Sequence, residues 1–157
     1  QVLLATLITH PDLQDALDEP LGTLNFSSPD LEKLRQGVLN ILAGETGLDF
    51  KGLEAHLCDV GLAEVAKGVL SDKVFDHAVF ARPGEPSETA LRGWEETLAL
   101  YKRDQLQAEI REAEQRLAEM PSEEAFRQLR ALKELERQGA ERGLAETGSG
   151  RRAGSVA

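Results

Sequence analysis

Aromatic residues and cysteine are scarce in this chain of 157 residues. Aromatic side chains make up 4% of the sequence, and Cys58 is the single cysteine. One cysteine excludes a disulfide within the chain, and such sparing use is typical of a reducing compartment. The sequence also lacks any run of 18 apolar residues, so it predicts no membrane-spanning helix. The hydrophobic share is nevertheless 41%, which is enough for a folded core.

Basic residues are too few in the first part of the chain for a phosphate-binding surface. Residues 1–100 hold 7 Lys+Arg against 17 Asp+Glu, whereas residues 101–157 hold 11 of each. The net charge of −10 therefore arises in the first hundred residues. Proteins that bind nucleic acid present clustered lysine and arginine to the phosphates. We expect no direct binding to nucleic acid.

Motifs that carry chemistry are also missing. The sequence has no CxxC, HExxH, GxSxG or glycine-rich phosphate loop. His56 and Cys58 are two residues apart, which places them on different faces of a helix, and Asp76 and His77 are adjacent, so their side chains diverge. We predict no catalytic residue, no metal ligand and no cofactor in this chain.

The start of the chain carries no initiating methionine. The first residue is Gln1, and Met120 is the single methionine. We interpret the sequence as a piece of a longer protein, in which any targeting signal lies upstream.

Leucine and alanine dominate the composition and favour an all-α fold. The opening LLATLITHPDLQDALDEP predicts a helix over 2–9, with an apolar face made by Leu3, Leu4, Leu7 and Ile8. His10 precedes a proline and should end this helix as a capping residue, and Pro11 should begin the next one, to about residue 18.

The stretch NFSSPDLEKLRQGVLNILAG contains the signals of a complete helix. Ser28 is the predicted N-cap, Pro29 the first helical residue and Gly44 a glycine just beyond the end. Its apolar stripe is Leu31, Leu34, Val38, Ile41 and Leu42. Shorter helices follow at about 49–58, 61–69 and 72–81, the last capped by Ser71 with Val74, Phe75, Ala78 and Val79 inward. Residues 1–82 are thus predicted to form a six-helix bundle.

A long helix follows the loop RPGEPSET at residues 82–89, in which Ser87 is the predicted cap. No proline interrupts the chain from about 88 to 119, so this helix should be roughly 45–50 Å long. Trp94, Leu98 and Tyr101 are spaced to meet the bundle. The second part carries a coiled-coil seam with steps of 4, 3, 4 and 3, made by Leu106, Ile110, Ala113, Leu117 and Met120.

The stretch EMPSEEAF predicts a turn between two helices. Pro121 ends the long helix and Ser122 starts another, which runs to about residue 138 with the stripe Ala125, Phe126, Leu129, Leu132 and Leu135. So short a connection predicts antiparallel helices. The predicted organisation is a bundle (1–82), a linker with the first part of the long helix (83–103), a C-terminal antiparallel helical hairpin (104–138) and a flexible tail (139–157).

The order of these elements resembles the C-terminal, helicase-binding domain of bacterial DnaG-type primases. The resemblance rests on LLATLITHPDL, FSSPDLEKLRQGVLNIL, GWEETLALYKRDQLQAEIREAEQRL and EEAFRQLRALKEL, and it covers nearly all of residues 1–138. In that family a helical bundle is followed by a hairpin, carried on a long helix, that docks on the replicative helicase hexamer. The catalytic core and the zinc-binding domain of the primase would lie upstream.

The resemblance implies a non-enzymatic, cytoplasmic interaction domain that is monomeric alone, binds a DnaB-type helicase and couples primer synthesis to the replication fork. We expect the hairpin to supply the docking residues: Leu106, Ile110, Leu117, Phe126, Arg127, Leu129, Arg130, Leu132 and Arg137. Two alternatives stay open. The chain could be the N-terminal domain of the helicase itself, which shares the bundle, or a helical oligomerisation module.

Overall fold

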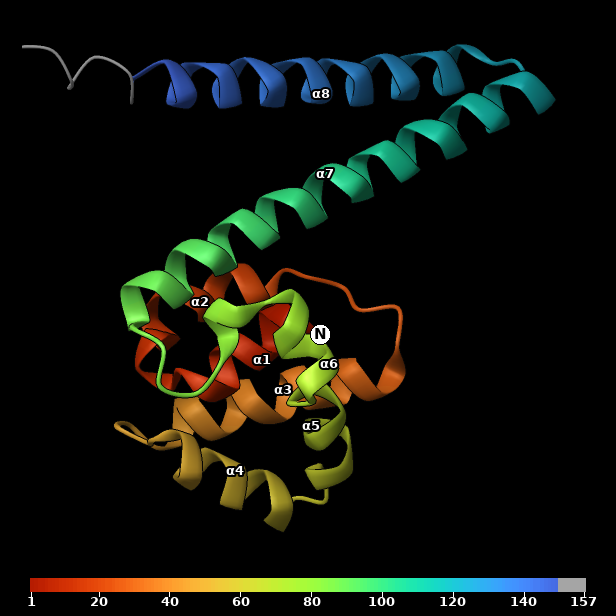
Figure 1. Ribbon diagram of the computed structural model, residues 1–157. Helices are drawn as coiled ribbons and strands as arrows, with labels where there is room; N and C mark the ends of the chain where they lie inside the picture. The colour runs from red at the N-terminus through yellow and green to blue at the C-terminus, as the bar shows by residue number, and fades with distance from the viewer. Residues whose placement is uncertain (150–157) are drawn as a thin grey trace, which may run out of the picture. The chain divides into compact units, whose positions relative to one another are not determined.

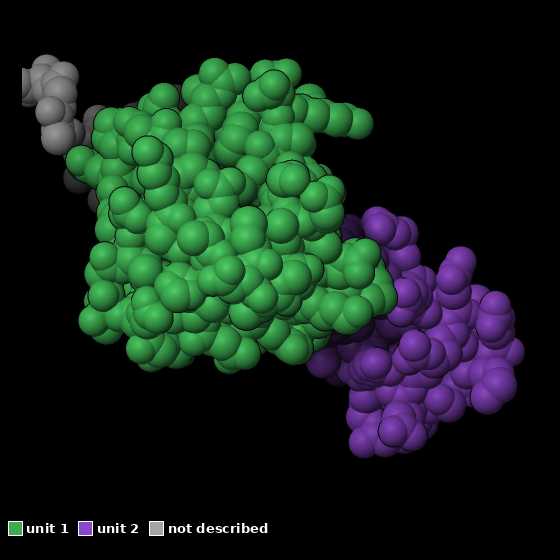
Figure 2. All heavy atoms as spheres, turned by 90° about the horizontal axis from the view of Figure 1, so that it is seen from below, with its two compact units in different colours: residues 1–98 green, residues 99–157 purple. Residues whose placement is uncertain are grey.

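The computed structural model describes the backbone of residues 1–149 and the side chains of residues 1–142. Every regular element within that range is helical, which confirms the predicted all-α fold class (Figure 1). The chain divides into two compact units, residues 1–98 and residues 99–157 (Figure 2). The boundary falls inside a helix rather than in the 82–89 loop.

Unit 1 contains six short helices, two 3₁₀ turns and the start of a long helix. Its elements are α1 (Val2–Thr9), η1 (Pro11–Leu13), α2 (Gln14–Gly22), α3 (Pro29–Gly44), α4 (Phe50–Asp59), α5 (Ala63–Val69), α6 (Asp72–His77) and η2 (Val79–Ala81). The long helix α7 (Ser87–Glu119) crosses from unit 1 into unit 2, where α8 (Glu123–Ser149) follows it.

The first helix, α1, lies at the centre of unit 1. All its residues from Leu3 to Thr9 are buried, and it contacts α2, α4, α5, α6 and η2. A helix surrounded in this way needs an apolar surface all round, not one stripe. The two threonines fit because Thr6 Oγ1 donates to the Val2 carbonyl at 3.0 Å and Thr9 Oγ1 lies 2.9 Å from the Ala5 carbonyl.

The corner at His10 is hydrogen-bonded to a loop far along the chain. His10 is the C-cap of α1, as the sequence predicted, but its ring is buried and has a second role. Nε2 lies 3.0 Å from the backbone oxygen of Glu85, and Nδ1 lies 2.9 Å from Thr9 Oγ1. A carbonyl oxygen can only accept, so Nε2 must carry a proton and donate it. The ring therefore fastens the first corner to the loop before α7.

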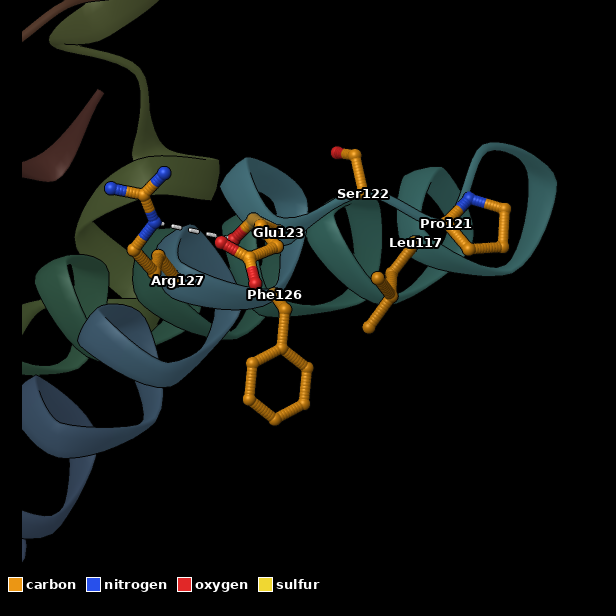
Figure 3. A pocket seen from close by; sticks show the side chains of 6 residues that line it. All are labelled: Leu117, Pro121, Ser122, Glu123, Phe126 and Arg127. Atoms are coloured by element: carbon orange, nitrogen blue, oxygen red, sulfur yellow. Dashed lines mark hydrogen bonds between the residues drawn. The ribbon is translucent and has the colours of Figure 1, made fainter.

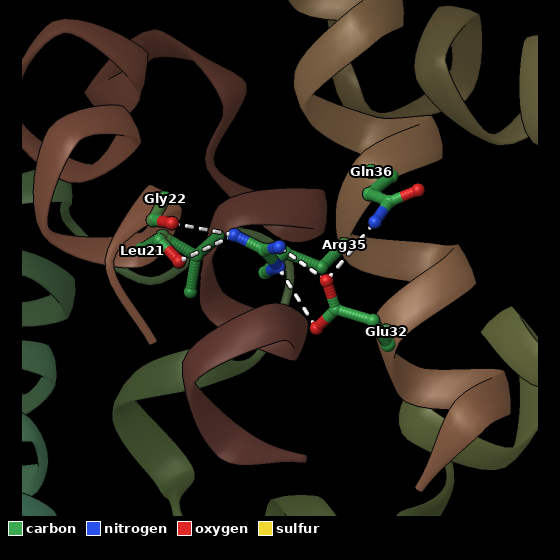
Figure 4. Close-up of polar contacts among 5 residues, drawn as sticks. All are labelled: Leu21, Gly22, Glu32, Arg35 and Gln36. Carbon is green, nitrogen blue, oxygen red and sulfur yellow. Dashed lines mark hydrogen bonds and ion pairs between the residues drawn. The ribbon is translucent and has the colours of Figure 1, made fainter. Parts of the chain in front are cut away.

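A side chain from α3 donates hydrogen bonds to the last carbonyls of α2. Nη1 of Arg35 donates to the carbonyls of Leu21 and Gly22 at 3.3 and 2.8 Å (Figure 4). The Leu21 carbonyl also accepts from the Leu24 N–H at 3.2 Å, just beyond the helix. The helix α2 continues past Pro20 and beyond the predicted end near residue 18. The same guanidinium also pairs with Glu32, because Nε of Arg35 donates to Glu32 Oε2 at 3.2 Å. The hydrogen bond from Arg35 is the main reason that the pKa of Glu32 is lowered.

The helix α3 begins as predicted and ends differently. Ser28 is its N-cap and accepts a long hydrogen bond of 3.5 Å from the Leu31 N–H. The prediction that Gly44 lies just beyond the helix is wrong, because Gly44 is its last residue. Glu45 follows in extended conformation and donates to the Ile41 carbonyl at 3.0 Å, which completes the last turn without a left-handed residue.

The prediction of a single helix over 72–81 is also wrong. Ala78 breaks it with φ −142° and ψ 70°, and η2 follows. The break exposes Val79, which was predicted to point inward, and buries Ala81 instead. It also places the Ala81 carbonyl 2.9 Å from Thr9 Oγ1. Ser71 makes no side-chain cap.

The first turns of α7 belong to unit 1 because their inward side chains are buried there. Ala90, Trp94 and Leu98 are buried, and Trp94 Nε1 donates to the Leu3 carbonyl at 3.0 Å. This is why the compact unit extends to residue 98 instead of ending at residue 82. Ser87 is not the cap that the sequence predicted. It is the first helical residue, and its hydroxyl donates to Asp12 Oδ2 at 2.5 Å.

Candidate protein-interaction site

Two helices and one tight turn make up the described part of unit 2. The turn covers residues 120–122, and Ser122 caps α8 by accepting from the Ala125 N–H at 3.1 Å. Pro121 lacks the N–H that α7 would need to continue, so α7 ends before it. The helix α8 is longer than predicted and reaches Ser149. The remainder of the predicted tail, residues 150–157, lies outside the described residues.

The greater length of α8 has a local cause. Gly139 faces open space and costs only helix propensity, about 1 kcal/mol relative to alanine. Arg137 offsets part of that cost because it pairs with Glu134 one turn before and with Glu141 one turn after. The glycine therefore does not end the helix.

Side-chain contacts join α7 to α8 in antiparallel order. They are Lys133 Nζ to Glu114 Oε1 at 2.7 Å, Arg116 Nη1 to Gln128 Oε1 at 3.1 Å, and Gln107 Nε2 to Glu136 Oε1. As the position on α7 moves toward the N-terminus, its partner on α8 moves toward the C-terminus. The hydrogen bond that Lys133 donates to Glu114 raises the pKa of Lys133.

The predicted docking residues differ in how accessible they are. Ile110 is buried, together with Ala113 and Ala125, so it is not available to a partner. The four leucines are half-buried: Leu106, Leu117, Leu129 and Leu132. Phe126 is 59% exposed, the only large apolar side chain of the predicted docking set that is open to solvent.

The turn forms a shallow, mainly apolar groove of about 560 Å³. Its lining is Leu117, Pro121, Ser122, Glu123, Phe126 and Arg127. Figure 3 shows the side chains of Leu117 and Phe126 extending on the same side of the turn, while Arg127 extends away from them. Met120 was assigned to the seam, yet it is 75% exposed because it lies in the turn, beyond the last residue of α7. Its flexible thioether suits an adaptable contact surface.

The three predicted docking arginines are not equivalent. Nε and Nη2 of Arg137 donate to Glu134 at 3.0 and 2.6 Å, so this guanidinium is used within α8. These bonds, with a smaller contribution from Gln138, lower the pKa of Glu134 to about 2. Nε of Arg127 donates to the Glu123 backbone oxygen at 3.4 Å. Among residues 1–142, neither Arg127 nor Arg130 forms a salt bridge.

A second concavity, of about 580 Å³, lies in unit 1 beside the first corner. Its carboxylates include Asp12, which accepts from Ser87, and Asp49, which caps α4 by accepting from the Gly52 N–H at 2.8 Å. These carboxylates have structural partners in the fold.

The candidate reactive pairs of the sequence do not come together. Asp76 pairs with Arg82 at 3.3 Å, and His56 lies 3.2 Å from Glu45. No cluster of His, Cys, Asp and Glu suited to a metal ion occurs in the described part of the chain. None of the described helices combines the length and the apolar character needed to cross a membrane.

No protein-family model matches this chain, and searches of curated proteins and of solved structures likewise found no match.

Proposed function

We propose that this chain is the helicase-docking domain of a bacterial primase. In this proposal α1 to α6 form a six-helix bundle, α7 carries the chain away from it, and α7 with α8 forms an antiparallel hairpin that binds a DnaB-type helicase hexamer. The observation that carries the proposal is the exposed apolar end of the two-helix unit, where Phe126 and Met120 are open to solvent beside the Leu117–Phe126 groove.

Exposed apolar side chains at one turn favour a protein partner. Fully burying a phenylalanine or methionine side chain contributes about 1.5–3 kcal/mol, and aromatic anchors commonly dominate interfaces. The balanced charge of residues 101–157, with 11 Lys+Arg and 11 Asp+Glu, suits protein contact better than phosphate contact. The resemblance of the sequence motifs to primases then names the helicase as the partner.

In this proposal, catalysis takes place in other parts of the protein. This domain would position the primase at the fork in the bacterial cytoplasm, whereas primer synthesis would take place in an upstream catalytic core. The domain itself would neither catalyse a reaction nor bind DNA directly. Its contribution would be a high local concentration of primase where the duplex is opened.

The test is binding of the whole chain and of a chain lacking residues 104–157 to a purified DnaB-type helicase hexamer. We expect the whole chain to bind and the truncated chain to lose binding while keeping its helical circular dichroism signal. Equal affinity of both chains would place the docking surface in unit 1. Failure of the whole chain to bind would refute the helicase assignment.

A further inference from the structure

The buried hydroxyl of Thr9 lies against more acceptors than its one proton can serve. Within 3.1 Å of Oγ1 are the carbonyl oxygens of Ala5, Thr6 and Ala81 and the Nδ1 atom of His10. The backbone of α1 supplies N–H donors to the first two carbonyls, and the His10 N–H donates to the Thr6 oxygen at 2.9 Å. Ala81 and His10 are therefore the two acceptors that depend on the hydroxyl proton.

The neutral His10 ring cannot relieve this shortage. Nε2 must keep its proton because the Glu85 backbone oxygen, 3.0 Å away, can only accept, and Nδ1 of a neutral ring is then an acceptor as well. Ala81 is fully buried, and within the described residues Thr9 is the only donor that reaches its oxygen. With a neutral ring, either Nδ1 or the Ala81 oxygen goes without a hydrogen bond.

A second ring proton completes the set of hydrogen bonds. When Nδ1 is protonated it donates to Thr9 Oγ1, and the hydroxyl proton is then free to go to the Ala81 oxygen. The contacts from His10 to Glu85, from His10 to Thr9 and from Thr9 to Ala81 then each hold a proton at the observed distances. The step takes up one proton from solvent, forms one N–H bond at Nδ1 and turns one hydroxyl hydrogen.

We infer that His10 and Thr9 form a pH-sensitive switch that fastens η2 to the end of α1. With the ring protonated, the Thr9 hydroxyl binds the Ala81 oxygen and holds η2. With the ring neutral, the hydroxyl turns to Nδ1 and the bond to η2 is lost. The bond from Nε2 to Glu85 is present in both states, so the switch acts on η2 and not on the loop that follows it. The inference does not depend on the proposed docking function.

The surroundings of the ring suit a positive charge. His10 is the C-cap of α1, where the helix carbonyls present the negative end of the helix dipole. The ring is buried, yet both N–H groups of the protonated form have acceptors, as a buried charged group requires. The segments that adjoin the ring carry four carboxylates and one guanidinium: Asp12 on η1, Asp15 on α2, Arg82 and Glu85 in the loop, and Glu88 on α7. Asp12 and Arg82 bind other partners, so neither forms a hydrogen bond or ion pair with the ring.

The sign of the pH effect follows from where the extra hydrogen bond exists. The bond from Thr9 to Ala81 forms in the folded chain alone, so only the folded chain gains it when the ring takes up a second proton. Unit 1 should therefore be more stable under mildly acidic conditions, and this stability should be lost as the pH rises and Nδ1 releases its proton. The chain has three histidines, so His56 and His77 supply matched controls.

The first experiment is urea unfolding of the full chain, followed by Trp94 fluorescence at about pH 5.5 and about pH 8, the range in which histidine changes charge. We expect the urea midpoint to be about 0.3–1 M higher at the lower pH. His10→Gln and Thr9→Val should each remove most of this difference, and the double variant should remove no more than either alone. The control substitutions His56→Gln and His77→Gln should retain it. An equal or lower midpoint at the lower pH, or a difference that persists in Thr9→Val, would overturn the inference.

A second measurement uses the unaltered chain, so it holds even where a variant fails to fold. Ring ¹⁵N NMR reports which nitrogens of His10 carry a proton. We expect Nε2 to be protonated at both pH values and Nδ1 to gain its proton toward the lower one. The protection factors of the amides of residues 79–82 should rise over the same pH range, since η2 is then held more firmly. An Nδ1 that stays unprotonated in the folded chain at about pH 5.5, or protection of residues 79–82 that does not follow it, would overturn the inference.

Discussion

Replacing Gly93 with alanine should destabilise unit 1, although alanine is the better helix former. A Cβ at this position would lie 2.3 Å from Phe80 Cγ and 2.5 and 2.6 Å from its Cδ atoms. The ring of Phe80 lies directly over Gly93, so the substitution forces η2 away from α7. Such overpacking costs about 1–3 kcal/mol, against a gain of about 1 kcal/mol in helix propensity. We expect Gly93→Ala to lower the free energy of unfolding by up to about 2 kcal/mol, which is the difference between those two magnitudes.

The sign of this effect should reverse when the ring is removed. In a Phe80→Ala background, Gly93→Ala meets no clash and should stabilise unit 1 by about 0.5–1 kcal/mol. The assay is urea unfolding followed by the fluorescence of Trp94, the single tryptophan, which is buried in unit 1. The matched control is Gly68→Ala, because Gly68 lies in α5 and a Cβ there would meet nothing within 4 Å. If Gly93→Ala stabilised the protein as much as Gly68→Ala does, with Phe80 present, the packing of η2 on α7 would be wrong.

Three further substitutions test the packing of unit 1 and the ion pair within α8. Leu34→Ala should cost about 2–5 kcal/mol because the side chain is fully buried in α3, and an unchanged urea midpoint would contradict its position. His10→Ala should cost about 1–3 kcal/mol, since it leaves the Glu85 carbonyl without its donor; amide hydrogen exchange in the 82–86 loop should rise in parallel. The Glu134 carboxyl should titrate near pH 2 by NMR, and Arg137→Gln should return its pKa toward 4.5. Because this pKa is depressed in the folded state, the stability it contributes is present above about pH 4.5 and is lost as the pH falls toward 2. A Glu134 midpoint near 4.5 in the unaltered chain would refute the contact with Arg137.

Local signals identified most of the helices. The cap at Ser28, the corner at Pro11 and the turn at Pro121 depend on residues adjacent in the chain, and a sequence displays such signals directly. The all-α class follows because these signals recur along a leucine- and alanine-rich chain. The end of α2 was missed because its last carbonyls are bound by Arg35, 13 and 14 residues further on.

Long-range contacts account for the remaining differences. His10 pairs with Glu85 across 75 positions, and no spacing in the sequence indicates that contact. The break at Ala78 follows from the packing of the next turn against α1 and α7, not from a proline or a glycine. In α7 and α8, periodicity predicted the apolar positions but not their exposure. Ile110 is buried and Phe126 is open, a difference set by where the helices contact each other.

Site-specific crosslinking tests the central proposal most directly, because it reports where a folded, full-length chain contacts its partner. A photoreactive phenylalanine analogue is placed at residue 126 in one sample and at residue 60 in another, and each is irradiated with a DnaB-type helicase hexamer. Phe126 and Val60 are 59% and 57% exposed, so the two probes are equally accessible in the free chain. We predict a crosslink to the helicase from position 126 and none from position 60. Crosslinking from position 60 alone would place the contact on unit 1 and contradict it.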